Sequence, residues 1–245
     1  MKACFFDIDG TLIVTGGAGQ VAFAETFADE FGIDRITDDI SFAGRSDRAI
    51  ATDLFRFHGV PVTDETWRRF QAGYLPRLDD ALQKCPGEVL PGVEDAIRGL
   101  EQRGDVLLGL LTGNVVRAAE KKLCHYGLWA RFTDAADTLP HTPPSGAAVV
   151  GGFGDHHSDR NDIAATAAQQ ARHAVRGSGG ATPAEGDLLV VIGDTLNDIR
   201  CGRSIGAKVV AVPTGHTPAE ELARHEPDLL VETLQDADEL LAWFE

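Results

Sequence analysis

Short, uninterrupted apolar runs alternate with helical patterns over most of the chain. Continuous apolar runs of this kind are typical of strands that are buried on both faces of a sheet. The clearest runs span residues 3–6, 106–111, 188–192 and 208–212, with weaker candidates at 147–152 and 229–231. Because helical stretches lie between them, the pattern predicts an α/β fold with a doubly wound, Rossmann-like parallel sheet.

Residues 15–87 differ from the rest, since they show helical periodicity and no convincing strand. Apolar residues recur at helical spacing over 21–31, and further helices are predicted over 47–59 and about 64–83. Pro76 predicts a kink or a break in the last of these. The segment is therefore predicted to be an all-helical insertion. Two stretches, Thr138–Gly146 and Arg176–Gly186, are predicted to be surface loops because of their Pro, Gly and Ser content.

Two carboxylates directly follow the first apolar run. Ile8 separates Asp7 from Asp9, so both side chains point the same way on an extended strand. Carboxylates this close repel each other unless a cation lies between them or one is protonated, and a divalent cation with oxygen ligands resolves the conflict. The layout offers a carboxylate nucleophile, a second carboxylate for proton transfer and a metal. Taken alone, the same residues also fit a solvated acidic turn.

The next two strong runs also end in polar residues. Thr112 and Asp194 follow them, and ligands of such sheets bind at the carboxyl ends of the strands. If the three strands are neighbours, Asp7, Thr112 and Asp194 converge at one edge. Asp198 lies four residues after Asp194, where it fits either a second metal ligand or a helix cap.

Thr112, Gly113 and Asn114 combine a hydroxyl, a backbone N–H without a side chain and a helix N-terminus. Together these groups suit the oxygens of a phosphate. An N-cap followed by a turn glycine is the alternative interpretation. His156 and His157 suggest a transition-metal site, but no third ligand has suitable spacing.

The formal net charge of −16 argues against nucleic-acid and anionic-membrane partners, which need basic surfaces. Any site that binds an anion must therefore be built from a few groups close to it, and not from the overall charge of the protein. The four cysteines, at positions 4, 85, 124 and 201, form no CxxC pattern and are predicted to be reduced thiols of a cytoplasmic protein. No signal peptide and no membrane span are predicted.

The motifs DIDGTL at 7–12, LLTGN at 110–114 and GDTLND at 193–198 occur in this order. Together they resemble the haloacid-dehalogenase-like (HAD) hydrolase superfamily. The helical insertion after the first motif is similar to the C1-type cap of the phosphoglycolate phosphatase-like branch. The resemblance implies a hydrolase core in residues 1–14 and 88–245 and a helical cap domain in residues 15–87.

The resemblance also implies roles for the acidic residues. Asp7 would be the nucleophile that becomes an aspartyl phosphate. Asp9 would protonate the leaving group and then activate water. Mg²⁺ would be held by the Asp7 carboxylate, the Asp9 backbone carbonyl and Asp194, with Asp198 close by. Thr112 and the Gly113 N–H would hold the phosphoryl oxygens, and Asn114 would touch the phosphate or the substrate.

The chain departs from the family at one point. The family uses a cation, usually Lys, before the fourth motif, and this chain has no Lys between Lys122 and Lys208. Arg160, near a loop-to-helix junction after a plausible strand, is the predicted substitute, with a surface arginine as the alternative. Arg45, in the polar segment 44–48, is predicted to reach over the active site. A plainly capped helix start explains that segment equally well.

The predicted function is Mg²⁺-dependent hydrolysis of a small phosphate monoester, phosphoglycolate-like or a sugar phosphate, by a monomer or homodimer. One alternative is a haloacid dehalogenase on the same fold, although Asp9 argues against it because halide needs no proton donor. A phosphomutase acting on a sugar phosphate is another. A binding module without activity is the third, and the intact acidic residues argue against it.

Overall fold

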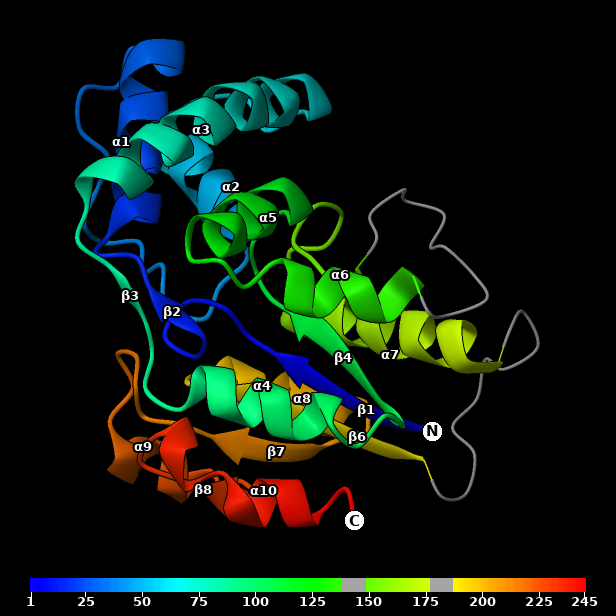
Figure 1. Ribbon diagram of the computed structural model, residues 1–245. Coiled ribbons are helices and arrows are strands. Elements are labelled where there is room, and N and C mark those ends of the chain that lie inside the picture. The colour runs from blue at the N-terminus through cyan, green and yellow to red at the C-terminus, as the bar shows by residue number, and fades with distance from the viewer. Residues whose placement is uncertain (138–148, 177–186) are drawn as a thin grey trace.

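The computed structural model describes residues 1–137, 149–176 and 187–245. Its larger sheet is parallel, with six strands in the order β5-β4-β1-β6-β7-β8 (Figure 1). Their bounds are Lys2–Phe6 (β1), Val106–Leu111 (β4), Gly151–Gly152 (β5), Leu188–Gly193 (β6), Lys208–Ala211 (β7) and Leu229–Leu230 (β8). The predicted doubly wound α/β fold is confirmed.

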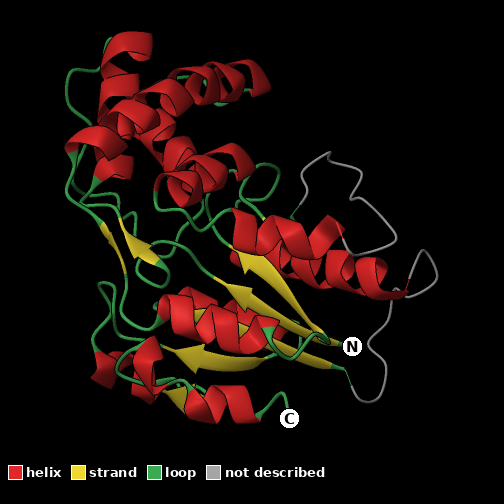
Figure 2. Ribbon diagram, viewed as in Figure 1, coloured by secondary structure: helices red, strands yellow, loops and turns green. Residues whose placement is uncertain are grey.

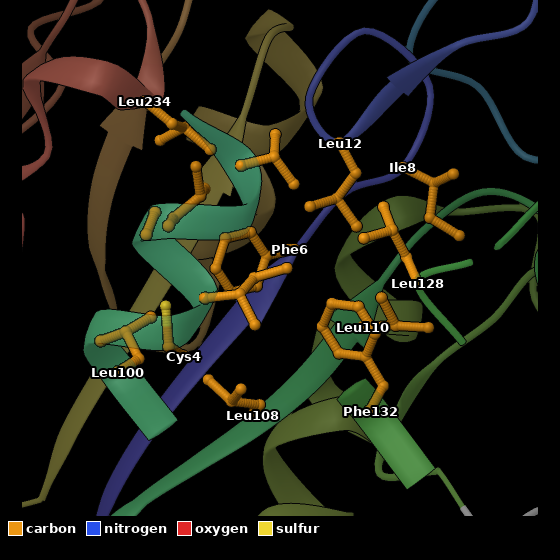
Figure 3. Packing of buried hydrophobic residues seen from close by; sticks show 14 of the residues in the cluster. Cys4, Phe6, Ile8, Leu12, Leu100, Leu108, Leu110, Leu128, Phe132 and Leu234 are labelled. Atoms are coloured by element: carbon orange, nitrogen blue, oxygen red, sulfur yellow. The ribbon is translucent and has the colours of Figure 1, made fainter. Parts of the chain in front are cut away.

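Side chains of β1 alternate between the two faces of this sheet, which explains its continuous apolar sequence. Cys4 and Phe6 enter one buried cluster, shown in Figure 3, whereas Ala3 and Phe5 enter another. Helices α4 (Val93–Glu101), α5 (Val116–His125), α6 (Ala130–Asp137) and α10 (Asp238–Ala242) contribute to the first cluster, with the 3-10 turn Leu234–Asp236. Helices α7 (Arg160–Arg176) and α8 (Leu196–Ser204) cover the other face, beside the short α9 (Ala219–Arg224). Figure 2 shows the helices on either side of the strands.

Three helices of the inserted segment form a separate group, seen at the top of Figure 1. They are α1 (Ala18–Phe31), α2 (Asp47–Phe57) and α3 (Asp64–Lys84), and they share a further apolar cluster, which Val115 and Ala118 at the start of α5 also enter. Where the segment joins the rest, β2 (Ile13–Val14) pairs with β3 (Glu88–Val89) in an antiparallel ribbon. The sequence did not predict this ribbon, because two-residue strands are too short to show periodicity. The division into a core of residues 1–14 and 88–245 and a cap of 15–87 stays a prediction.

Helix α3 passes through Pro76 without a break. Of the predicted kink or break, the break is wrong, because Tyr74 and Leu78 on either side are buried in the same cluster and hold both halves of the helix against one surface. The kink stays a prediction. The Arg77 guanidinium donates to the Gly73 carbonyl at 2.7 Å near the proline. Tertiary packing here overrides a local helix-breaking signal.

The two predicted surface loops lie outside the described residues, apart from Arg176, the last residue of α7. The four cysteines are free thiols. None of the helices in the described ranges is long and apolar enough to cross a membrane.

Candidate active site

Three neighbouring strands, β4, β1 and β6, bring their carboxyl ends to one place. Asp7 follows β1, and its N–H donates to the Ile192 carbonyl of β6 at 2.9 Å. Thr112 directly follows β4, and Asp194 directly follows β6. All three side chains are buried and line one cavity of about 520 Å³. The structure therefore places the three predicted strand-tip residues together.

The turn after β1 depends on Gly10, which adopts a left-handed conformation with φ +86°. A Cβ at this position would lie 2.6 Å from Oδ2 of Asp194, so only glycine lets the two loops approach so closely. Thr214 and Thr11 complete the junction: the Thr214 hydroxyl donates to the Gly10 carbonyl at 2.6 Å, and the Thr11 hydroxyl donates to Asp194 at 3.3 Å. The turn and the Asp194 loop thus form one packed unit.

Asp7, Asp194 and Asp198 form a compact acidic group, with one oxygen of each within 4.8 Å of the others. Burial, with the neighbouring charges of Asp198 and Asp9, raises the pKa of Asp7 to about 7 against the pull of Arg160. Burial and the charges of Asp198 and Asp7 raise the pKa of Asp194 to about 9. A bound cation relieves the repulsion among these three carboxylates, so the group fits a hard divalent ion, which prefers oxygen ligands.

Asp198 has less freedom to bind a metal than Asp7 or Asp194. Its Oδ2 accepts from both the N–H and the hydroxyl of Thr195, in a capping box at the start of α8. Its Oδ1 accepts from the Arg160 guanidinium. Asp198 therefore belongs to the acidic group and caps α8 at the same time. Because both of its carboxylate oxygens already accept hydrogen bonds, Asp194 is better placed than Asp198 to bind a metal directly.

Arg160 reaches the strand ends from the first residue of α7. Its guanidinium lies 3.5 Å from Oδ1 of Asp7 and donates to the Leu111 carbonyl at 3.3 Å. Burial lowers the pKa of this guanidinium, but the carboxylates of Asp198 and Asp7 raise it above its ordinary value. A buried arginine on two site carboxylates is not a surface arginine, so that alternative is wrong.

The segment Thr112-Gly113-Asn114 crosses between the strand ends and the inserted helices. The Thr112 hydroxyl accepts from the Asn114 amide at 2.9 Å, and that amide also donates to Oδ2 of Asp9 at 2.8 Å. At Gly113 a Cβ would collide with the Arg45 carbonyl. The Gly113 carbonyl accepts from the Asp47 N–H at 2.8 Å.

Arg45 lines the cavity, but its guanidinium is paired with Asp53 at 2.5 Å and also lies near the Ser41 carbonyl. Its predicted contact with the substrate stays a prediction. The capped start of α2 is present as well, since the Ser46 side chain accepts from the Ala49 N–H. Within the described residues, Asp7, Asp194 and Asp198 are the single group of three or more acidic, His or Cys side chains that lie close enough together to share a metal ion.

A family model described as HAD-hydrolase-like matches residues 160–237. The phosphoglycolate phosphatase of Synechococcus elongatus is 29% identical over 238 residues, covering 96% of this chain and 95% of that protein. The CbbY protein of Rhodobacter sphaeroides, solved in complex with phosphate, has the same fold over 97% of this chain and 96% of its own, with a TM-score of 0.67 and 20% identity.

The chain is thus similar to HAD-like hydrolases in sequence and in fold. The similarity to the Synechococcus elongatus protein extends over nearly the whole of both chains, as the resemblance to the phosphoglycolate phosphatase-like branch implies. The HAD fold also carries other chemistry: a Thermotoga maritima protein provisionally assigned as a β-phosphoglucomutase matches over 99% of both chains, with a TM-score of 0.58 and 19% identity.

One residue of this HAD-like site was missed by the sequence analysis. Lys122 on α5 is buried and lines the cavity, and its ammonium donates to Oδ2 of Asp9 at 2.6 Å. A signal was available, because Lys122 falls at helical spacing with Val115, Ala118 and Ala119 on an otherwise apolar face. A lysine on such a face needs a buried partner.

Proposed function

We propose that the protein is a Mg²⁺-dependent phosphatase that hydrolyses a small phosphate monoester through an aspartyl phosphate on Asp7. One observation carries the proposal: Asp7, Asp9, the buried cation Arg160 and Asp194 of the acidic metal-type group all line one cavity. The substrate class follows from the size of that cavity, about 520 Å³, and from its polar end at the strand tips.

Asp7 attacks phosphorus, and an Asp7 oxygen–phosphorus bond forms as the ester bond breaks. Asp9 gives its proton to the departing alkoxide, then takes a proton from the water that hydrolyses the aspartyl phosphate. Thr112 and the Gly113 N–H hold the transferring oxygens, and Arg160 links them to Asp7. Asn114 orients Asp9 and lies beside the phosphoryl group.

Asp7, Asp194 and the Asp9 backbone carbonyl would hold Mg²⁺, with Asp198 behind them. The ion would offset the charge of the phosphoryl oxygens and of the two buried carboxylates. The raised pKa values of Asp7 and Asp194 support this assignment, since burial and the neighbouring carboxylates disfavour their charged forms and a bound cation would favour them.

We assign residues 15–87 as the cap and residues 1–14 and 88–245 as the core. Support comes from the cavity, whose walls include Phe23, Phe42 and Tyr74 of the inserted segment and the strand tips opposite them. The cap would exclude water and set specificity for a phosphoglycolate-like ester or a sugar phosphate. A cytoplasmic monomer or homodimer stays the prediction for location and assembly.

The proposal is tested by phosphate release from a broad panel of phosphate monoesters. We expect turnover with Mg²⁺, none after EDTA, and none for Asp7→Asn, whose thermal unfolding should stay cooperative. Inclusion of sugar bisphosphates separates the phosphomutase alternative, which would interconvert sugar phosphates faster than it releases phosphate. Inclusion of a 2-haloacid tests the dehalogenase. Near wild-type phosphate release by Asp7→Asn would contradict the nucleophile assignment.

A further inference from the structure

We propose that Lys122 is a positioning residue, which holds the Asp9 carboxylate and the Asn114 amide in the arrangement needed for proton transfer to the leaving group. This inference rests on the proposed function, which gives Asp9 the proton-transfer role. Lys122 belongs to none of the three sequence motifs, and it is contributed by α5 rather than by a strand tip.

Three hydrogen bonds join these side chains in a closed ring. The Lys122 ammonium donates to Oδ2 of Asp9 at 2.6 Å and to Oδ1 of Asn114 at 2.7 Å. The Asn114 amide donates to the same Oδ2 of Asp9 at 2.8 Å. Because the ammonium binds the amide oxygen, it directs the Asn114 NH₂ group toward Asp9 and Thr112. Lys122 therefore fixes both the carboxylate and the amide that contacts it.

The burial of the pair shows which partner meets the substrate. The Lys122 side chain is 5% exposed and that of Asp9 is 42% exposed. The ammonium thus lies behind the carboxylate, while the carboxylate faces the cavity. Both described hydrogen bonds to this carboxylate end on Oδ2, which orients Oδ1 without occupying it. This is the geometry of a group that acts through Asp9.

Other groups around Lys122 come from the inserted helices. Burial raises the pKa of Asp47 to about 7, and the charge of Lys122 opposes that rise. A Cβ on Gly19 would lie 3.7 Å from the Lys122 ammonium and 4.0 Å from the Tyr74 hydroxyl, so α1 and α3 both lie next to the Lys122 ammonium. A purely structural role, in which Lys122 neutralises buried carboxylates between the two layers, is the competing explanation.

The two explanations differ in how turnover depends on the leaving group. Lys122→Met keeps the length of the side chain and removes its charge. If Lys122 acts through Asp9, this variant should lower kcat for alkyl phosphates roughly 10- to 100-fold, as expected when a catalytic group loses a hydrogen-bond partner outside the reacting atoms. It should lower kcat for activated aryl phosphates far less, because their leaving groups need less protonation. Lys121→Met is the matched control, because Lys121 is the next residue on α5 and pairs with Asp79 near the surface. It should leave both activities unchanged.

A double-mutant cycle adds a second readout. Asp9→Asn alone should show the same leaving-group dependence, and adding Lys122→Met to it should cause no further loss. If Lys122→Met does not fold, the double variant, which removes both charges, is still compared with Asp9→Asn alone. Lys122→Arg should recover part of the alkyl phosphate turnover.

Two outcomes would overturn the inference and leave the phosphatase assignment intact. One is that Lys122→Met lowers alkyl and aryl phosphate turnover equally. The other is that Lys122→Met lowers turnover as much in the Asp9→Asn background as it does in the wild type. If Asp9→Asn itself shows no leaving-group dependence, the role of Asp9 fails, and the inference fails with it. The Asp9→Asn series therefore separates failure of the inference from failure of the proposed function.

Discussion

At the scale of single residues, the charged form of Asp194 is disfavoured by burial and by neighbouring carboxylates. It is buried, and burial together with the charges of Asp198 and Asp7 raises its pKa to about 9. An unfolded chain has an ordinary aspartate there, with a pKa near 3.8. Between these two values the folded state binds more protons than the unfolded state. The free energy of unfolding therefore falls as the pH rises through this window.

This linkage predicts the behaviour of Asp194→Asn in EDTA. The variant lacks the titrating group, so its stability relative to the wild type should increase as the pH rises from 3.8 to about 9, the window set by the two pKa values. A difference of one unit between the pKa values corresponds to about 1.4 kcal/mol, and we expect at least that increase. Urea unfolding at several pH values measures it. A stability difference that is constant with pH would contradict the assignment.

Arg160 is the second residue whose role can be tested directly. Its guanidinium lies against Asp7 and Asp198 in a buried site, so Arg160→Ala should lower kcat by roughly 10²–10³-fold, the usual cost of losing one charge-stabilising donor. Arg160→Lys should recover part of the turnover, because it keeps the charge but not the planar fork.

Arg172→Ala is the control for Arg160, since Arg172 is a buried arginine farther along the same helix. Steady-state kinetics should show normal turnover for this control at a temperature where all variants are folded. If Arg160→Ala turns over as fast as the control, the site cation must be sought elsewhere, and Arg45 becomes the better candidate.

At the scale of elements, the start of α2 is bound to the loop after β4. The Asp47 N–H donates to the Gly113 carbonyl at 2.8 Å, and the Asp47 carboxylate accepts from the Val115 N–H at 2.8 Å. The Ser46 hydroxyl donates to the Ser158 carbonyl at 2.9 Å. These bonds connect an inserted helix to two loops of the sheet, so the position of the helix depends on the backbone at Gly113.

Gly113→Ala should disturb this connection. Its Cβ would collide with the backbone carbonyl of Arg45, and backbone cannot rotate away as a side chain can. We expect a loss of about 1–3 kcal/mol in the free energy of unfolding from overpacking, and a fall in turnover because the Gly113 N–H moves. Thermal unfolding and kcat measure the two effects.

Gly19→Ala is the stability control for this prediction. Its Cβ would meet the Lys122 ammonium at an ordinary contact distance of 3.7 Å and would favour the helix it belongs to. The control should be as stable as the wild type or more so. If Gly113→Ala is equally stable and active, the contact between the two elements is adjustable and does not set the site.

At the scale of the whole molecule, the net charge of −16 sets how the enzyme meets its substrate. A phosphate monoester is also negative, so the long-range interaction is repulsive and attraction begins only at the local site. Raising the salt from about 20 to about 200 mM shortens the screening length and should raise kcat/KM modestly, at constant free Mg²⁺.

The salt dependence is measured with inert NaCl, and a viscosity control separates screening from other effects of salt. A steep fall in kcat/KM with salt would mean that a local cationic surface attracts the substrate despite the overall charge. That outcome would contradict the prediction.

Local sequence determined the sheet strands and the residues at their ends. The run Ala3–Phe6 is apolar at every position because both faces of β1 are buried, and Asp7 must follow it at the strand tip by covalent connection. The same reasoning located Thr112 and Asp194. The capped start of α2 at Ser46 also depends on nearest neighbours, so the sequence alone could offer it as one of the two interpretations of segment 44–48.

Tertiary structure decided everything that joins distant segments. The order β4-β1-β6 makes the three tips neighbours, and no local pattern encodes strand order. Packing across α3 kept the helix continuous through Pro76. Lys122 meets Asp9 across 113 positions of sequence, and Arg160 meets Asp7 across 153. Such contacts depend on how layers pack against one another, whereas sequence periodicity reports only which face of an element is buried.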